Sequence, residues 1–384
     1  MPTTGLRGKG KFMLHPRFRT LVLITALAVS LLAAFTGAAG ASSSHTVPHK
    51  ANSYRTVDLI SDQPGVARHM DPNLVNAWGL VSGPSTPWWI ADNGKDVSTL
   101  NDGHGNAIPL VVKVAGAPTG TVFNGGSDFV VHHQGFSGPS VFMFATESGT
   151  IRGWNPDVPP PSPSTHSFVV VNRSSEGAIY KGLAIASTAS GAGDRLYATD
   201  FHNARVDVFN GNFHQVNMPG AFVDPNIPDG YAPFGIRNLD GKIFVTYAKQ
   251  DADAEDDAPG PGRGFVDMYS LNGTLLGRVA SRGPLDSPWG LALAPNGFGR
   301  FGGDLLVGNF GGDGRINAYA LESNGSAEHA GTLRRSNGQP VAIDGLWALS
   351  FGNGGPAGAK GRLFFTAGPD GESHGLFGRI TANK

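Results

Sequence analysis

The segment AWGLV (77–81) decides the fold, because similar short segments recur along the chain at nearly constant intervals. The segments compared are AWGLV around Gly79, SDFVV around Phe129, KGLAI around Gly182, PFGIR around Gly235, PWGLAL around Gly290 and DGLWAL around Gly345. Their successive spacings are 50, 53, 53, 55 and 55 residues. A fixed period of this length is typical of repeat folds in which each repeat is one supersecondary unit.

Each segment is followed by further short apolar runs that are rich in Val, Phe, Tyr and Leu and are separated by Gly, Asn, Asp or Pro. Such runs are strand signals, and the residues between them are turn signals. Six units of about four strands predict an all-β protein, a six-bladed β-propeller of four-stranded antiparallel blades. A β-sandwich, the alternative, requires no fixed period. The segment 54–61 has no place in the repeat, and we expect it to close the ring as the outer strand of the last blade.

Residues 1–41 are predicted to be a signal peptide. Five basic residues precede the apolar run 21–35, which is short and rich in alanine, and Ala39 and Ala41 fit the small-residue positions of a cleavage site. A retained N-terminal anchor is the alternative. We expect a flexible segment at 42–53 and a single propeller domain at 54–384, secreted to the extracellular space or periplasm, with no membrane span once the leader is removed.

Charge and cysteine content narrow the function classes. The whole chain has a formal net charge of −1, and the leader carries five basic and no acidic residues, so the remainder stands at −6. This acidic balance argues against nucleic acid as a partner. The chain has no cysteine, so its stability must come from the packed core. We expect a monomer that binds a small molecule or a protein.

Long motifs carry a resemblance to a known family. They are SDQPGVARHMDPNLVNAWGL (61–80), WWIADNG (88–94), LYATDFHNARVDVF (196–209), VTYAKQDADAEDDAPGPGRGFVDMY (245–269) and GDLLVGNFGGDGRINAY (303–319). They resemble a family of exported bacterial proteins without an assigned activity, some of which end in a C-terminal sorting signal. The sequence ends in GRITANK, without a hydrophobic sorting segment, so we expect it to differ from the anchored members. More distantly, the repeat resembles NHL-repeat propellers and the calcium-dependent lactonases related to senescence marker protein.

The repeat places several polar side chains on one face. In a four-stranded blade, the turn from the second to the third strand lies on the same face as the entry to the first strand, and propeller sites usually lie on that face over the channel. The predicted second strands end in Asp92, Glu147, Asp200 and Asn309. Such a ring of side-chain oxygens suits Ca²⁺, so these four residues are candidate metal ligands.

The lactonase resemblance implies a metal that polarises a substrate carbonyl and activates water. Asp200 is then the candidate general base, with His202 two residues later to share its proton. The alternative is that strand-end Asp and Asn side chains cap turns by bonding to their own backbone. Trp78, Trp289 and Trp347 are expected to pack between blades. The candidate ligand-binding residues on this face are Asn76, Asp92, Asn93, Asn203 and Tyr247.

The acidic segment DADAEDDAPGPG (251–262) is predicted to lie between the second and third strands of the fourth unit, at the channel mouth. Asp251, Asp253 and Glu255 alternate, so weak Ca²⁺ binding there is one interpretation. The segment lacks the interior glycine and the ligand spacing of an EF-hand loop. The interpretation that we favour is an anionic flap over the channel.

Three functional hypotheses follow from the sequence. The first is a secreted propeller that binds a ligand or a protein partner on its channel face without chemistry. The second is a calcium-dependent hydrolase of the lactonase type. The third is a structural, envelope-associated protein. Convergence of the four ring residues on one point would favour the hydrolase.

Overall fold

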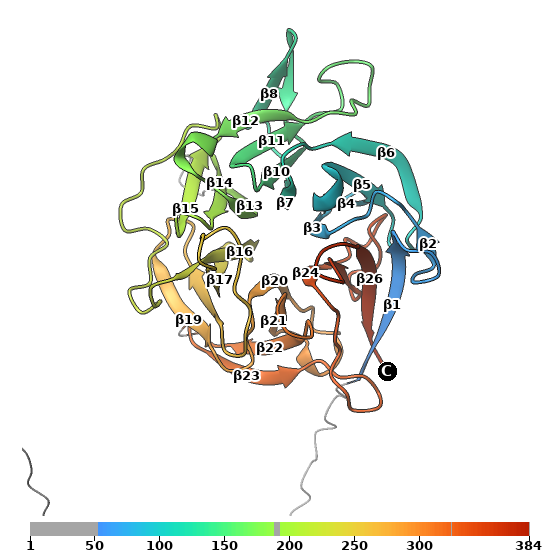
Figure 1. Ribbon diagram of the computed structural model, residues 1–384, viewed down its shortest axis with the longest axis vertical. Coiled ribbons are helices and arrows are strands. Elements are labelled where there is room, and N and C mark those ends of the chain that lie inside the picture. The colour runs from blue at the N-terminus through green and yellow to red at the C-terminus, as the bar shows by residue number, and fades with distance from the viewer. Residues whose placement is uncertain (1–52, 188–192, 324, 384) are drawn as a thin grey trace, which may run out of the picture. The chain divides into compact units, whose positions relative to one another are not determined.

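The computed structural model describes residues 53–187, 193–323 and 325–383, all of which lie in one compact unit. The predicted signal peptide 1–41 and the predicted flexible segment, apart from Ser53, lie outside the described residues. Figure 1 shows small twisted sheets arranged in a ring around a common axis, with their first strands innermost. The six-bladed, all-β propeller predicted from the repeat is therefore confirmed.

Consecutive strands within a blade are antiparallel and run from the channel outward. Blades 1 and 2 contain β3 (Ala77–Val81), β4 (Trp88–Asp92), β5 (Val97–Asn101), β6 (Ala107–Lys113), β7 (Pro118–Phe123), β10 (Phe142–Thr146), β11 (Thr150–Trp154) and β12 (Phe168–Asn172). Blades 3 and 4 contain β13 (Tyr180–Ser187), β14 (Asp194–Asp200), β15 (Arg205–Asn210), β16 (Tyr231–Leu239), β17 (Lys242–Lys249), β18 (Gly264–Tyr269) and β19 (Leu275–Ser281). Blade 5 contains β20 (Pro288–Leu293), β21 (Leu305–Asn309), β22 (Ile316–Leu321) and β23 (Ala327–Thr332).

Blade 6 joins the two ends of the described chain. Its inner strands are β24 (Leu346–Phe351), β25 (Leu363–Ala367) and β26 (Leu376–Ala382). Its outer strand is β1 (Tyr54–Ser61), which pairs antiparallel with β26 from Tyr54 opposite Ala382 to Ser61 opposite Leu376. The short β2 (His69–Met70) adds in parallel to β1. The expected closure of the ring by residues 54–61 is confirmed, and Figure 1 shows β1 beside β26.

The closing strand is held by its buried side chains as well as by its hydrogen bonds. Leu59 is fully buried and packs in a cluster with Phe364 and Phe377 of blade 6. We expect Leu59→Ala to lower the free energy of unfolding by about 2–4 kcal/mol, because the cavity it leaves cannot refill from a paired strand. Urea denaturation measures this loss. The exposed Arg55 on the same strand supplies the control, and Arg55→Ala should change stability by less than about 0.5 kcal/mol.

Blade 2 differs from the prediction. The segment SDFVV was expected to be its inner strand, but the inner strand is β7, and residues 130–139 form a separate hairpin of β8 (Val130–His133) and β9 (Phe136–Pro139). In Figure 1 this hairpin projects beyond the ring. The true repeat glycine is Gly120, which lies 41 residues after Gly79 and 62 before Gly182, because the hairpin is inserted in this blade. A nearly constant spacing therefore selected the wrong segment.

Blade 3 differs in a smaller detail. It contains three strands within the described ranges, and Gln215 takes the outer position through a single bridge to Phe209 of β15. Three short 3₁₀ turns complete the secondary structure: η1 (Asn93–Lys95), η2 (Ser174–Glu176) and η3 (Gly299–Phe301). In the part of the chain that the structure describes, no helix has both the length and the apolar character that crossing a membrane requires.

The repeat glycines bring neighbouring inner strands into close contact. A Cβ atom on Gly79 would lie 2.3 Å from the carbonyl oxygen of Thr119 on the next inner strand. The corresponding distances are 2.3 Å from Gly120 to the Leu183 nitrogen and 2.2 Å from Gly235 to the Trp289 oxygen. Side chains cannot occupy these contacts, so glycine at the repeat centre sets the width of the channel.

Candidate functional site

The residues that precede the repeat centre on the six inner strands surround the channel. They are Trp78, Thr119, Lys181, Phe234, Trp289 and Trp347. In blade 6 this centre is Ala348 and not Gly345, because β24 begins only at Leu346. The rings of Trp78 and Trp347 stack with centroids 3.5 Å apart, and Trp289 packs edge-on against both at 6.3 and 5.9 Å. We name Trp78, Phe234, Trp289 and Trp347 the aromatic plug. The tryptophans were expected to pack between blades, and Trp347 of blade 6 does contact Trp78 of blade 1 and Trp289 of blade 5, at the channel end of the blade interfaces.

Lys181 is the one cation at these six positions, and it lies on the plug. Its side chain is 1% exposed, and its ammonium nitrogen lies 5.3 Å from the ring centroid of Trp78. The ammonium donates to Glu147 Oε1 and, over 2.7 Å, to Asp256 Oδ1. Burial lowers the pKa of Lys181, but the two carboxylates outweigh burial and hold it above its ordinary value. The lysine is therefore charged at neutral pH.

Amide and carboxylate groups from other blades surround this ion pair. Asn93 Nδ2 donates to Glu147 Oε2 over 2.9 Å, and Asn76 Nδ2 donates to Asn93 Oδ1 over 3.1 Å. Asn76 Nδ2 also donates to Glu372 Oε2 over 2.6 Å, while its Oδ1 accepts from the indole nitrogen of Trp347 over 2.8 Å. Asp257 lies near enough to Lys181 and Asp256 for their charges to act on it. We name the site that contains these groups, together with Lys181, Asp256 and Asp257, the mouth cluster.

Several residues of this region have a left-handed backbone conformation, which residues other than glycine rarely adopt. Asn76, Ser287 and Glu372 have φ values of 46°, 42° and 67°. Asn76 and Ser287 are buried and hold equivalent positions, two residues before Trp78 and Trp289. Left-handed backbone at residues other than glycine is unfavourable and collects at functional sites. Two of these residues, Asn76 and Glu372, are hydrogen-bonded to each other.

Two carboxyl groups in the mouth cluster have no basic partner within ion-pair distance among the described residues: Asp257 and Glu372. Asp257 Oδ2 is buried and accepts no hydrogen bond from the described part of the chain. Burial raises the pKa of Asp257 to about 6 and that of Glu372 to about 7. The cluster thus holds four carboxyl groups, including Glu147 and Asp256, against one ammonium group.

The structure does not assemble the predicted oxygen ring. Asp92 is fully buried, and its Oδ2 accepts from the Thr99 backbone over 2.9 Å, while Asn309 donates to the Pro284 carbonyl over 2.8 Å. Glu147 pairs with Lys181 instead of facing other acids. Across residues 53–187, 193–323 and 325–383, no three His, Asp or Glu side chains are placed to hold a metal ion. These strand-end Asp and Asn side chains hydrogen-bond to nearby backbone groups, as the alternative interpretation states.

Asp200 and His202 are neighbours in sequence but not partners. Asp200 accepts from the Ile179 and Asn203 backbone nitrogens over 3.3 Å each and from Asn203 Nδ2 over 2.8 Å. Arg205 lies 3.2 Å from its second oxygen. His202 Nδ1 is buried and bonds to none of the described side chains. Asp200 thus caps the turn after β14, and neither Asp200 nor His202 belongs to the mouth cluster.

The remaining predicted residues also separate. The Tyr247 hydroxyl bonds to that of Tyr269 over 2.6 Å in a buried cluster, so Tyr247 faces a neighbouring blade and not the channel. Asp251, Asp253 and Glu255 are exposed on the loop between β17 and β18, where Asp251 Oδ1 accepts from the Glu255 backbone. Of the candidate ligand-binding residues, only Asn76 and Asn93 meet in the mouth cluster.

Sequence reasoning missed Lys181, Asp256, Asp257 and Glu372 as members of one site. A signal for Lys181 exists, because YKGLA (180–184) carries lysine where AWGLV and PWGLAL carry tryptophan. Asp256 and Asp257 are hidden among similar acidic neighbours in their loop. Glu372 lies in the loop between β25 and β26. No sequence pattern indicates the left-handed backbone of this residue.

Comparisons with known proteins give relatives and structural neighbours. Gluconolactonase XC5397 of Xanthomonas campestris is similar in fold, with a TM-score of 0.37, 16% identity, and coverage of 63% of this chain and 82% of that protein. No protein-family model matches the chain. The uncharacterised protein R648 of Acanthamoeba polyphaga mimivirus is 34% identical over 336 residues, which are 84% of this chain and 78% of R648.

The uncharacterised protein L690 of the same virus is also 34% identical, over 76% of this chain and 77% of L690. These relatives are viral, so the resemblance to exported bacterial proteins stays a prediction. The identity extends over most of the propeller and over most of each relative. The chain belongs to the same protein family as R648 and L690 of Acanthamoeba polyphaga mimivirus.

Proposed function

We propose that the protein binds a small organic cation, one with an ammonium or guanidinium group, in the mouth cluster. The observation that carries this proposal is the pair of carboxyl groups, Asp257 and Glu372, that lack a basic partner in the described structure. Uncompensated buried carboxylates reduce stability, so stability alone does not account for them. A bound cation compensates their charge.

The acidic loop 251–262 supplies the cover of this site. Asp256 anchors the loop on Lys181 and keeps 69% of its side chain exposed, while Glu147 is 29% exposed. A ligand therefore reaches the carboxylates from the solvent side of the loop, above the aromatic plug. Calcium-dependent hydrolysis is not proposed, because Asp92, Asp200 and Asn309 have partners within their own blades. Export, a monomeric state and the absence of nucleic-acid partners stay predictions.

The test is calorimetric titration with agmatine and benzylamine, each beside a carboxylate of similar size, at pH 8 and pH 6. We expect the cations to bind at pH 8 and to bind more weakly at pH 6. The reason is that Glu372, with a pKa of about 7, and Asp257, with a pKa of about 6, gain protons over this interval. If neither cation binds better than the matched carboxylate at pH 8, the proposal fails.

Glu372→Gln separates binding from stability. The folded-state pKa of Glu372 exceeds its usual 4.5, so ionisation destabilises the fold, and this penalty grows as pH rises from about 4.5 to about 7. The variant should be more stable than the wild type at pH 8 by about 1–2 kcal/mol. It should nevertheless bind the cation at least about 10-fold more weakly. Glu322→Gln, at an exposed glutamate in blade 5, is the matched control and should change neither property.

A further inference from the structure

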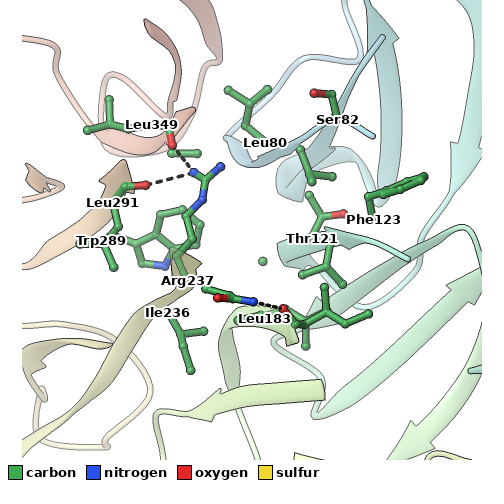
Figure 2. A pocket seen from close by; sticks show the side chains of 17 residues that line it. Leu80, Ser82, Thr121, Phe123, Leu183, Ile236, Arg237, Trp289, Leu291 and Leu349 are labelled. Atoms are coloured by element: carbon green, nitrogen blue, oxygen red, sulfur yellow. Dashed lines mark hydrogen bonds between the residues drawn. The ribbon is translucent and has the colours of Figure 1, made fainter. Parts of the chain in front are cut away.

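A second site lies in the channel on the other side of the aromatic plug. The inner strands enter at the mouth, so the residues that follow the repeat centres lie toward the opposite face. These residues, contributed by all six inner strands, enclose a cavity of about 240 Å³ (Figure 2). Its apolar wall includes Leu80, Val122, Leu183, Ile236, Leu291 and Leu349. Trp289 lines it from the plug.

One charged side chain, Arg237 of β16, lines this cavity. Its Nη1 donates to the Leu291 carbonyl over 3.0 Å and to the Leu349 carbonyl, and its Nη2 donates to Ser350 Oγ over 2.7 Å. Figure 2 shows the guanidinium reaching from β16 toward Leu291 and Leu349. All three acceptors are neutral. The side chain is partly exposed, and because it lies inside the channel, the exposed part faces the cavity.

Arg237 has no counter-charge. No carboxylate of the described chain lies within ion-pair distance of it, although seven other basic residues there form such pairs: His104, Arg173, Lys181, Arg205, Arg278, Arg315 and His374. Burial lowers its pKa to about 10, which still leaves the guanidinium charged at neutral pH. A largely buried cation without a counter-charge lowers the stability of the fold unless an anion pairs with it.

We propose that this cavity binds a small organic acid, whose carboxylate pairs with Arg237 and whose apolar body fills the space between the inner strands. The planar fork of an arginine matches a carboxylate in two parallel hydrogen bonds. The three bonds to neutral acceptors use only part of its five N–H donors, so donors remain for the ligand. The apolar wall distinguishes an organic acid from a bare inorganic anion.

Size and polarity narrow the ligand class further. A volume of about 240 Å³ equals that of roughly eight water molecules at 30 Å³ each, which suits an acid with a short chain or a single ring. Asn238 Nδ2 donates to the Ile185 carbonyl over 3.0 Å, while its Oδ1 is buried without a donor in the described structure. An acid that also carries a hydroxyl group would satisfy this oxygen. A polar depression that shares Phe123, Ile185 and Asn238 with the cavity adjoins it.

The test is isothermal titration of the full chain with benzoate, hexanoate and inorganic phosphate. Each organic acid is compared with its neutral amide, benzamide or hexanamide. We expect at least one of the two acids to bind at least about 10-fold more tightly than its amide, because only the acid forms the charged pair. Equal binding of acid and amide would overturn the proposal. Phosphate binding as tight as that of the acids would overturn the assigned role of the apolar wall.

Two variants connect the binding to the arginine. Arg237→Gln should abolish the preference for acid over amide, and Arg237→Lys should reduce it, because lysine keeps the charge but not the fork. Arg315→Gln, at an exposed arginine that pairs with Asp313, is the control and should leave the preference unchanged. Thermal melting checks that each variant folds. If Arg237→Gln does not fold, the result for Arg237→Lys decides the test. A preference that survives in the folded variants would contradict the assignment.

Discussion

Gly235→Ala is expected to lower the free energy of unfolding by about 4 kcal/mol or more, the range of the most damaging single substitutions. The added Cβ would lie 2.2 Å from the carbonyl oxygen of Trp289 and 3.0 Å from Thr246 Oγ1. The first of these atoms belongs to the backbone of the next inner strand and cannot rotate away. One methyl group therefore has to push two blades apart, and a closed ring transmits that displacement to its other contacts.

Guanidinium denaturation of the full chain measures this effect. The matched control is Gly361→Ala in blade 6, where an added Cβ meets no atom within 4 Å. The control should stay within about 0.5 kcal/mol of the wild type, as surface substitutions usually do. Similar small losses for both variants would show that the blades are not held at the distance described.

The second large effect is expected for Lys181→Met at neutral pH. Removing the ammonium leaves Glu147 and Asp256 without their shared cation, in a cluster that already holds Asp257 and Glu372. Lys181 is buried, but Asp256 and Glu147 keep 69% and 29% of their side chains exposed, so we expect a loss of about 1–3 kcal/mol, less than for a fully buried pair. The pKa of Lys181 is raised in the folded state, so its stabilising contribution is fully present below about pH 10.5, its usual value, and is lost only as pH rises through the higher folded value.

The same variant should release the acidic loop, which offers a second measurement. Lys249 and Arg263 flank the loop, so trypsin should cleave at these residues faster in Lys181→Met than in the wild type. Lys242→Met, at an exposed lysine that begins β17, is the control. Adding Glu147→Gln and Asp256→Asn to Lys181→Met should recover part of the lost stability, because the orphaned charges are then gone. No recovery would mean that the lysine acts through packing alone.

Most of the fold was predictable because the hydrophobic repeat reports the blades directly. Five of the six inner strands and the closing strand follow from it. The inner strand of blade 2 was not predicted because its sequence, PTGTVF (118–123), contains proline, glycine and two threonines. The β8–β9 hairpin contains a more apolar run near the expected spacing. Burial of that inner strand comes from its neighbours around the ring, and its own composition does not reveal it.

The site was predictable only in part, because it depends on which way alternate side chains point. Asn76, Asn93 and Glu147 were expected on the channel face and do meet there. Tyr247 was expected there too, but adjacent residues of a strand face opposite sides, and it is Ala248 that packs against the aromatic plug. Arg237 carries no motif, and only the positions of all six strands show that it lacks a counter-charge.

The pairing of β1 with β26 has a consequence for the order of events during protein synthesis. The ribosome makes β1 near the beginning and β26 near the end, and Tyr54 contacts Ala382 only after almost the whole chain has emerged. Blades 1 to 5 can form as they appear, but the ring stays open, with a strand edge of blade 6 unpaired. Long-range pairing of this kind is slow, and an open edge is prone to bind other chains. Closure of the ring therefore waits for β26, and the interval before it is when the protein is most exposed to aggregation.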